Sequence, residues 1–238
     1  MPEVSIIIPT FNEEKRLELL LQSLSIQDYK DYEIIVSDNG SKDNTLKIAQ
    51  KYHCKIAKGG LPARGRNNGA KIAKGRILIF MDADTVLERG SLSKLVGEFK
   101  IRDLDCGSVL VKPFQGLWID KVLYWIWNFW AFSTQLIYPH GTGAFIICKK
   151  KAFNTVRGFD ESIKVGEDHH FVAKVRLHGY KYRILLHSKI SISVRRLEAE
   201  GRAKVFLKVL FLGFHRTFIG ELRREDFGYN FEYRKKFN

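Results

Sequence analysis

Residues 77–87 read ILIFMDADTVL, an apolar run that ends in two aspartates, Asp82 and Asp84. An apolar run of this length suits a strand that is buried on both faces of a sheet. If the strand continues through Met81, both aspartates point to the same side, because strand side chains alternate with period two. A divalent metal with oxygen ligands would neutralise such a pair. A solvated strand end, where aspartate is common, is the alternative that this stretch alone leaves open.

Short apolar strands alternate with helical patterns before this run. This order predicts an α/β fold with a mostly parallel, Rossmann-like sheet flanked by helices. The expected strands are Val4–Ile8, Glu33–Val36, Lys55–Ala57 and Ile77–Met81, and the expected helices are Glu13–Ile26, Asp43–Tyr52 and Arg66–Lys74. Because no repeat or Ser/Pro-rich linker interrupts the chain, we expect a single domain.

Polar clusters follow three of these strands, at 10–13, 38–39 and 82–84. In open α/β sheets, ligands bind beyond the carboxyl ends of the strands. We therefore expect the three clusters to lie along one edge of the sheet and to form a binding site.

The composition restricts the partners and the compartment. The 238 residues carry a net charge of +14, which implies attraction to an anionic partner such as nucleic acid, a membrane surface or phosphorylated small molecules. Three widely spaced cysteines argue against a zinc site or a disulfide framework and favour a reducing, cytoplasmic location. The first ten residues are typical of a strand rather than a signal peptide.

The usual phosphate-binding motifs are missing. The first strand is followed by PTFNEE rather than G-x-G-x-x-G, and the P-loop pattern does not occur. The basic, glycine-rich segment 59–69 is a candidate diphosphate cradle, since backbone N–H groups and arginines at a helix start bind phosphate. A flexible surface loop with solvated arginines is the alternative.

Together these motifs resemble the family 2 inverting glycosyltransferases, which have a GT-A fold. The resemblance covers roughly residues 4 to 196, and residues 197–238 would form a basic, aromatic, helical C-terminal extension. The matching stretches are Pro9–Glu13, Glu33–Thr45, Arg66–Gly69, Met81–Asp84, Gly141–Phe145, Gly158–Glu161 and Gly166–Asp168.

The resemblance implies a nucleotide-diphosphate-sugar donor, a Mn²⁺ or Mg²⁺ ion and inversion at the anomeric carbon. It implies that Asp84, with Asp82, binds the metal and that Asp168 is the catalytic base. The nucleotide-sugar-binding residues that it implies are Pro9, Thr10, Glu13, Asp38, Arg66, Asp82, Ala83, Gly143 and Arg195.

Several of these assignments have plain structural alternatives. Asp168 could simply cap a helix expected over Asp168–His178. Arg195 and Arg196 are adjacent, a pattern more typical of a solvated face. His169 and His170 diverge on a helix and cannot readily chelate one ion, so we expect a structural or acceptor-facing role.

Two apolar segments raise the question of a membrane. Residues 117–138 hold all four tryptophans, and residues 204–220 mix Phe and Leu with basic side chains. Burial within the protein is the ordinary explanation for the first segment. With the charge of +14, the two segments favour peripheral contact with the anionic inner face of the cell membrane. We then expect a lipid-linked or glycan acceptor and a role in cell-envelope glycan biosynthesis.

Three other functions remain open from sequence. A nucleotidyltransferase would also need a metal and a nucleotide pocket. A nucleic-acid-binding protein would use the positive charge and the aromatic residues. The acidic residues expected at the ligand edge would repel a polyphosphate that lacks metal, so we expect no nucleic-acid partner. The third open function is that of a relative of these enzymes that only binds partners and has no catalytic activity, although Asp82, Asp84 and Asp168 are all present.

Overall fold

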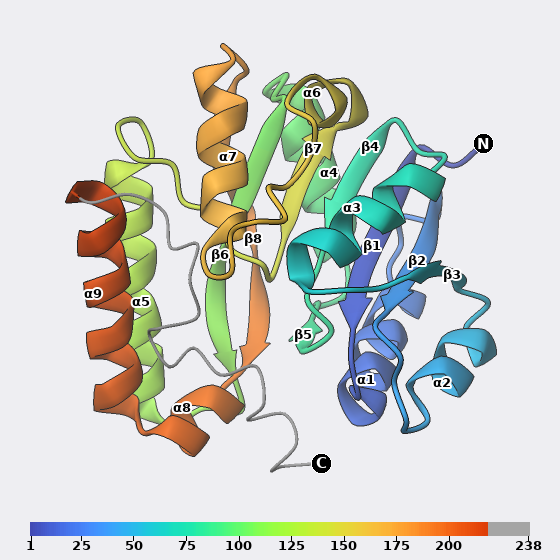
Figure 1. Ribbon diagram of the computed structural model, residues 1–238, viewed down its shortest axis with the longest axis horizontal. Coiled ribbons are helices and arrows are strands. Elements are labelled where there is room, and N and C mark those ends of the chain that lie inside the picture. Colours follow the sequence, from blue (N-terminus) through green and yellow to red (C-terminus); the bar gives the residue numbers. More distant parts are fainter. Residues whose placement is uncertain (219–238) are drawn as a thin grey trace.

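The computed structural model describes residues 1–218, and these residues form one eight-stranded sheet flanked by helices (Figure 1). The strand order is β3-β2-β1-β4-β7-β6-β8-β5. The strands are β1 (Val4–Thr10), β2 (Tyr32–Asp38), β3 (Lys55–Lys58), β4 (Ile77–Phe80), β5 (Thr85–Val86), β6 (Cys106–Phe114), β7 (Ile146–Lys149) and β8 (Tyr182–Ser193). The helices are α1 (Glu14–Ser25), α2 (Thr45–Lys51), α3 (Pro62–Ile72), α4 (Ser91–Ile101), α5 (Trp118–Thr134), α6 (Lys150–Thr155), α7 (Glu167–Leu177), α8 (Arg195–Glu200) and α9 (Arg202–Phe218).

The N-terminal half of the sheet is parallel, as predicted. Val4 of β1 lies opposite Tyr32 of β2 and Ile77 of β4, and β3 continues in the same direction. The rest of the sheet is mixed: β7 is antiparallel to β4 and β6, and β5 is antiparallel to β8. The carboxyl ends of β1, β2 and β4 therefore share one edge, which is where the sequence places the polar clusters.

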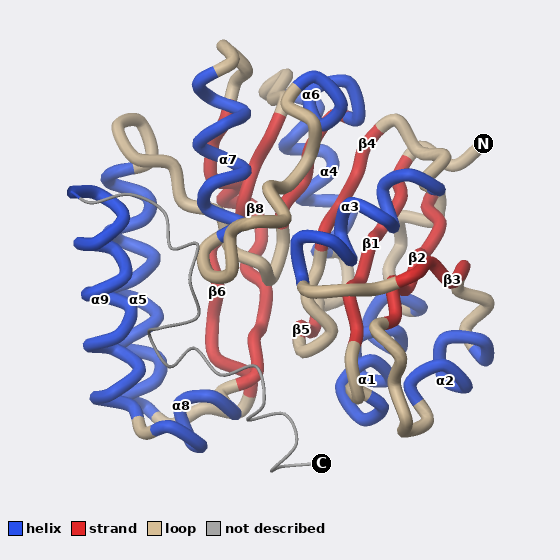
Figure 2. The backbone as a smooth tube through the Cα atoms, in the orientation of Figure 1, coloured by secondary structure: helices blue, strands red, loops and turns tan. Residues whose placement is uncertain are grey.

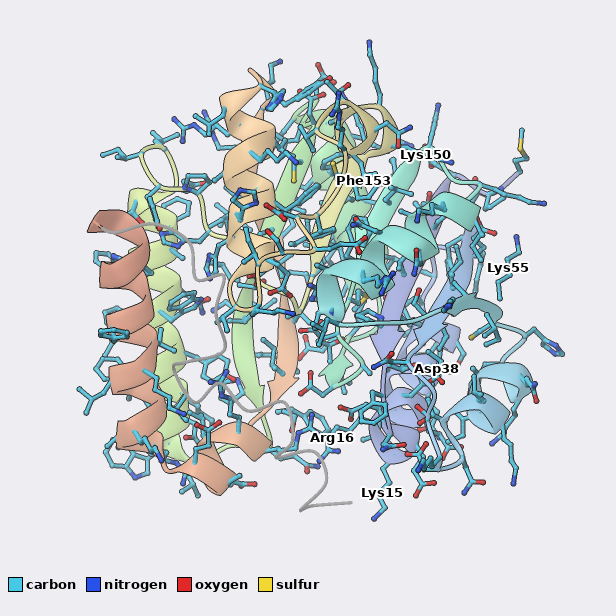
Figure 3. The ribbon with its side chains drawn as sticks, viewed as in Figure 1. Lys15, Arg16, Asp38, Lys55, Lys150 and Phe153 are labelled. Carbon is cyan, nitrogen blue, oxygen red and sulfur yellow. The ribbon has the colours of Figure 1, made fainter. Side chains whose placement is uncertain are left out.

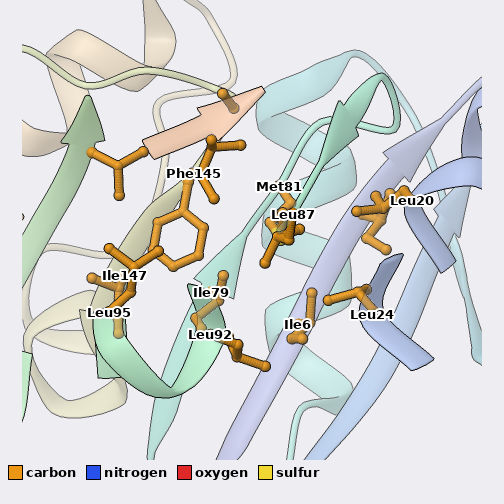
Figure 4. Close-up of a cluster of buried hydrophobic side chains, with 14 of the residues drawn as sticks. Ile6, Leu20, Leu24, Ile79, Met81, Leu87, Leu92, Leu95, Phe145 and Ile147 are labelled. Carbon is orange, nitrogen blue, oxygen red and sulfur yellow. The ribbon is translucent and has the colours of Figure 1, made fainter. Parts of the chain in front are cut away.

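The alternation of side chains in β1 builds a core on each face of the sheet. Ile6 and Ile8 pack with leucines of α1 and α4, whereas Ile7 packs on the other face with residues of α3, α6 and α7. Figure 4 shows the first core, where Ile6 lies between Leu92 and Leu24. This period of two is the one expected of a strand buried on both sides.

Among the element boundaries that differ from the sequence prediction, those of β4 and α3 concern the expected site. Strand β4 ends at Phe80, so Asp82 and Asp84 lie in the turn that leads to β5 rather than on the strand. Most of the glycine-rich segment 59–69 is not a loop, because α3 already begins at Pro62. Proline is favoured in the first helical turn, since its missing N–H has no intrahelical partner there.

The glycines of α3 serve close packing between helix and sheet. A Cβ atom on Gly69 would lie 2.4 Å from Cγ2 of Ile7, and one on Gly65 would lie 3.1 Å from Cβ of Pro9. These glycines let α3 approach β1 and thereby bring Arg66 to the ligand edge.

Helices α5 and α9 stand side by side at the edge of the molecule beyond β6 and β8 (Figures 1 and 2). Arg202 at the start of α9 forms an ion pair with the buried Asp120 of α5, and Val205 packs near Tyr124. Within residues 1–218, no helix is long and apolar enough to cross a bilayer. The predicted extension is described only as far as residue 218, and residues 219–238 lie outside the described part.

Candidate active site

The loops after β1 and β2 are joined by side-chain hydrogen bonds at the ligand edge. Thr10 Oγ1 donates to Asp38 Oδ1 at 2.9 Å, and Ser41 Oγ donates to the same oxygen at 2.5 Å. The backbone N–H groups of Gly40 and Ser41 donate to Asp38 Oδ2. Asp38, which Figure 3 shows near the end of β2, therefore holds the turn that follows this strand. Thr10 and Asp38 are both buried.

Arg66 occupies the centre of the site and joins two acidic residues from different parts of the chain. Its Nη2 atom lies 2.7 Å from Asp82 Oδ1, and its Nη1 atom lies 2.6 Å from Glu167 Oε1. The arginine is only 1% exposed, and its guanidinium also lies over the ring of Phe159. Asp82 follows β4 and Glu167 begins α7, so this arginine connects the two halves of the site.

The charges around Arg66 shift its pKa and that of its partner. Burial opposes the charge on Arg66, but the carboxylates of Asp82, Glu167 and Asp168 outweigh it and raise the pKa of the guanidinium. Burial also raises the pKa of Glu167, against the opposing effect of Arg66 and with a further contribution from Asp168. The influence of Asp168 on both groups follows from its position next to Glu167 at the start of α7.

Arg195 forms a second centre of charge. Its Nη2 atom lies 3.0 Å from Glu13 Oε1 and 3.5 Å from Asp84 Oδ2. Both Arg195 and Glu13 are buried, so the alternative of a solvated arginine face is wrong for Arg195. Arg196 points elsewhere and pairs with Glu200. The two aspartates of the 82–84 turn thus contact two different arginines.

The loop that contains Gly141 and Gly143 is packed between the two predicted catalytic regions. A Cβ on Gly143 would lie 2.5 Å from Asp82 Oδ2 and 2.8 Å from Arg66 Nη2. A Cβ on Gly141 would lie 2.4 Å from the backbone oxygen of Asp168. Only glycine fits at both positions, and the loop thereby brings Asp168 into the neighbourhood of Asp82.

Asp168 lies in the first turn of α7, which begins one residue earlier than predicted. The N-cap position belongs to Gly166, whose φ of 82° is in the left-handed region that favours glycine. Asp168 is therefore not the N-cap residue, although its Oδ1 accepts a hydrogen bond from the backbone N–H of His169 at 2.8 Å. The positive end of the helix dipole favours its ionised form.

An aromatic and histidine cluster adjoins Asp168 on the side of α5. The ring of His169 lies 6.0 Å from that of Trp127 and 5.7 Å from that of His140, between centroids. The buried His140 ring also lies 4.2 Å from Trp130 and contacts Thr134 Oγ1 through Nε2 at 2.8 Å. His140 was not predicted as part of the site, because its contact with His169 joins two distant segments of the chain.

The remaining predicted residues also lie at or near this edge. Pro9 is in β1 beneath α3, and Ala83 is buried in the core cluster that contains Ile6. The structure therefore brings all the predicted site residues to one edge of the sheet, while their contacts with a ligand stay predictions.

The acidic residues of the 82–84 turn suit a particular kind of metal site. Among residues 1–218, no group of three or more His, Cys, Asp or Glu side chains could enclose an ion. Mg²⁺ and similar ions, however, are often held by one or two carboxylates together with substrate phosphates. The side chains of Asp82 and Asp84 are 40% and 22% exposed, so their oxygens are accessible for that arrangement.

The polar edge built from three strand ends lies where open α/β sheets bind their ligands, and it defines the candidate site of a ligand-binding α/β protein. The family model described as glycosyl transferase family 2 matches residues 5–156. The chain belongs to this family.

Known proteins similar to the chain include two bacterial enzymes. It is 39% identical over 105 residues to a GalNAc(5)-diNAcBac-PP-undecaprenol beta-1,3-glucosyltransferase of Campylobacter jejuni, an alignment that covers 40% of this chain and 34% of the relative. It is 25% identical over 201 residues to the poly(ribitol-phosphate) beta-N-acetylglucosaminyltransferase TarS of Staphylococcus aureus, over 78% of this chain and 34% of TarS. The chain thus matches about a third of the length of both relatives.

Solved structures share the GT-A fold. A TarS fragment in complex with UDP-GlcNAc superimposes with a TM-score of 0.67 and 24% identity, covering 81% of this chain and 58% of that one. A mannosyltransferase from Pyrobaculum calidifontis in complex with GDP-Man and Mn²⁺ gives a TM-score of 0.70 and 20% identity, covering 88% and 64%. These similarities confirm the predicted fold class.

Proposed function

We propose that this protein moves a sugar from a nucleotide-diphosphate sugar to an acceptor hydroxyl or phosphate, with inversion and with a divalent metal. The observation that carries the proposal is the position of Arg66 between Asp82 and Glu167. Asp82 follows β4 at the edge where α/β sheets bind ligands, and Glu167 directly precedes Asp168. One buried arginine therefore keeps the donor side and the candidate base together.

The proposed reaction is a single displacement at the anomeric carbon. The acceptor oxygen forms a bond to this carbon while the bond from the carbon to the diphosphate oxygen breaks, and the electron pair leaves with the diphosphate. The proton of the acceptor hydroxyl passes to the carboxylate of Asp168, which acts as the general base. The loop at Gly141 and Gly143 supports this arrangement, since it is packed against both Asp168 and Asp82.

Asp84, with Asp82, would hold Mn²⁺ or Mg²⁺ on the diphosphate, where such an ion neutralises the charge of the leaving group. Arg66 and Arg195 are then the fixed positive charges of the protein beside these carboxylates. The nucleotide pocket at the ends of β1 and β2 would be shaped by Pro9, Thr10, Glu13 and Asp38. Asp38 accepts three hydrogen bonds from the turn after β2 and one from Thr10 of β1, and these contacts support a rigid pocket wall.

The acceptor side of the proposal is a lipid-linked or glycan molecule. The names of the relatives support it, since one acts on an undecaprenol-linked glycan and the other on poly(ribitol-phosphate). We further propose a cytoplasmic protein bound peripherally to the membrane. A nucleotidyltransferase is the second candidate because the same edge would serve it, but family membership favours glycosyl transfer.

A donor panel with Mn²⁺ tests the reaction, with release of the nucleotide diphosphate and donor binding as readouts. We expect Asp84→Ala to lose donor binding, and Asp168→Asn to keep binding but lose turnover. Asp103→Asn, a change at an exposed aspartate of the surface, serves as the matched control and should behave as wild type. Turnover that is equal in all four proteins would contradict the mechanism.

A further inference from the structure

One face of α5 carries a continuous row of exposed apolar side chains, here termed the aromatic stripe. Its members recur at intervals of three or four residues, so they lie on one side of the helix. Trp125 and Phe129 stack with ring centroids 5.9 Å apart. The stripe consists of Trp118 (74% exposed), Val122 (44%), Trp125 (65%), Phe129 (63%), Phe132 (45%) and, just after the helix, Leu136 (51%).

The opposite face of α5 is fixed to the protein. Asn128 donates to the backbone oxygen of Val111 at 2.7 Å and accepts from its N–H at 3.0 Å. Ala131 and Asp120 are buried on the same side. The alternative that residues 117–138 are buried within the protein therefore does not hold for the outer half of α5. The stripe cannot turn inward, because that would break the contacts with β6.

The chemistry of the stripe fits the surface of a bilayer. Tryptophan is enriched at the level of lipid headgroups, and an apolar helix face lined by basic residues lies in the plane of the interface. Lys121 is exposed beside Trp118 and Trp125. On the neighbouring helix α9, Lys204 and Leu207 are exposed, and they lie one turn apart. With a net charge of +14, the surface complements anionic lipid.

The inner face of α5 lies next to the candidate base, Asp168. Trp127 contacts the ring of His169, the residue after Asp168, and Trp130 contacts His140. The thickness of an α-helix with its side chains is about 10 Å. A bilayer in contact with the stripe would therefore lie roughly one helix diameter from the aromatic cluster that adjoins Asp168.

We propose that the aromatic stripe is the surface by which this protein lies on an anionic bilayer, with the site of Asp168 about one helix diameter from the lipid headgroups. The assignment of the membrane-binding surface rests on the exposure and the side-chain chemistry of α5. The consequence for the acceptor, that it is lipid-linked and reaches Asp168 from the membrane plane, rests on the proposed function.

Vesicle sedimentation tests the surface with the full chain. The vesicles are phosphatidylcholine alone or phosphatidylcholine with phosphatidylglycerol, at low salt. The test variant is Trp125→Glu/Phe129→Glu. The matched control is Ile101→Glu/Leu177→Glu, which makes the same charge change at residues that are 84% and 86% exposed and lie on α4 and α7. Thermal unfolding checks that both variants fold.

We expect wild type and the control to sediment with the anionic vesicles and the stripe variant to partition at least about tenfold less. Wild type that stays in the supernatant, or a stripe variant that sediments equally well, would overturn the proposal. If wild type self-associates, does not bind vesicles, and the stripe variant is monomeric, the proposal is overturned. The stripe would then be a contact surface between two copies of this chain. Hydrolysis of the donor in solution is measured in parallel, so that failure of the catalytic proposal is seen separately from failure of vesicle binding.

Discussion

Arg66 Nη1 lies 2.6 Å from Glu167 Oε1, although the two residues are 101 positions apart in the chain. The same guanidinium binds Asp82, so one buried cation serves two carboxylates. A buried charge is tolerated only when it is paired and hydrogen-bonded. The contact therefore makes the position of α7, and of Asp168 within it, depend on the residues that follow β4.

Removal of Arg66 should be strongly destabilising. Arg66→Met leaves two carboxylates without their cation, and breaking a buried pair in this way typically costs about 3–5 kcal/mol. Glu167→Gln in the Arg66→Met background should recover part of this loss, because it removes one uncompensated charge. Chemical denaturation of the two single variants and the double variant measures the coupling. Arg64→Met, at an exposed arginine, is the control and should change stability by less than about 0.5 kcal/mol.

The free energy of unfolding should depend on pH through Glu3, which lies just before β1. A hydrogen bond from Tyr29, together with Arg76 and Lys100, lowers the pKa of Glu3 from 4.5 to about 2. Because the pKa is lower in the folded state, the stabilisation is complete above the unfolded value of about 4.5 and is lost as the pH falls toward about 2. Glu3→Gln should therefore reduce stability at neutral pH by about 1–2 kcal/mol, after allowance for solvent screening.

The measurement for Glu3 is the free energy of unfolding of both proteins between about pH 7 and about pH 3. The difference between them should shrink steadily below about pH 4.5. A difference that is constant over this range would show that the charge of Glu3 does not contribute.

The sequence predicts the parallel half of the fold well because its signals are local. Apolar runs bounded by turn residues mark β1, β2 and β4, and parallel pairing then places their carboxyl ends at one edge. The antiparallel β7 and β5 were not predicted, since both are short and their pairing depends on contacts across the whole chain.

The chemistry of the site was harder to predict than its location. Asp82 and Asp84 suggest one shared metal ion, which stays a proposal, but nothing in their spacing predicts that each also contacts a different arginine, Arg66 of α3 or Arg195 of α8. Arg195 is 182 residues from Glu13, its nearest partner, and no sequence spacing reports such a pair. The exposure of α5 could not be predicted from the sequence either. An apolar helix has the same sequence pattern whether its surface packs against protein or is exposed.

The packing of α3 on β1 can be tested with one methyl group. In Gly69→Ala the new Cβ would fall 2.4 Å from Ile7 Cγ2 and 2.7 Å from Ser37 Oγ, so we expect a loss of about 1–3 kcal/mol from overpacking. Gly97→Ala in α4 is the matched control, since nothing lies within 4 Å of its Cβ. It should stabilise the protein by up to about 1 kcal/mol through helix propensity. Thermal unfolding that ranks the two variants in the reverse order would contradict this packing.

The loop beside Asp82 offers a test of function rather than stability. In Gly143→Ala the methyl group would press on Asp82 Oδ2 and Arg66 Nη2, so the carboxylate must move. We expect donor turnover to fall by at least about tenfold, because small displacements of catalytic groups are costly. Gly97→Ala in α4, where nothing lies within 4 Å of the new Cβ, controls for the effect of a methyl group far from the site. Unchanged turnover in Gly143→Ala would remove this loop from the active site.

An ion pair and apolar packing join α9 to α5, and the ion pair can be measured by a double-mutant cycle. Arg202 Nε lies 2.7 Å and Nη2 3.0 Å from the two carboxylate oxygens of Asp120, whose side chain is fully buried. Hydrogen bonds to charged groups are stronger than neutral ones, so we expect a coupling energy of about 1–3 kcal/mol between Arg202→Met and Asp120→Asn. Arg202→Met alone should cost more than Asp120→Asn, because it leaves a buried carboxylate whose remaining described partner is the N–H of Leu117. Lys121→Met, one residue along α5 but exposed, should show no coupling to Arg202; equal coupling for both pairs would mean that general electrostatics, and not this contact, holds α9 in place.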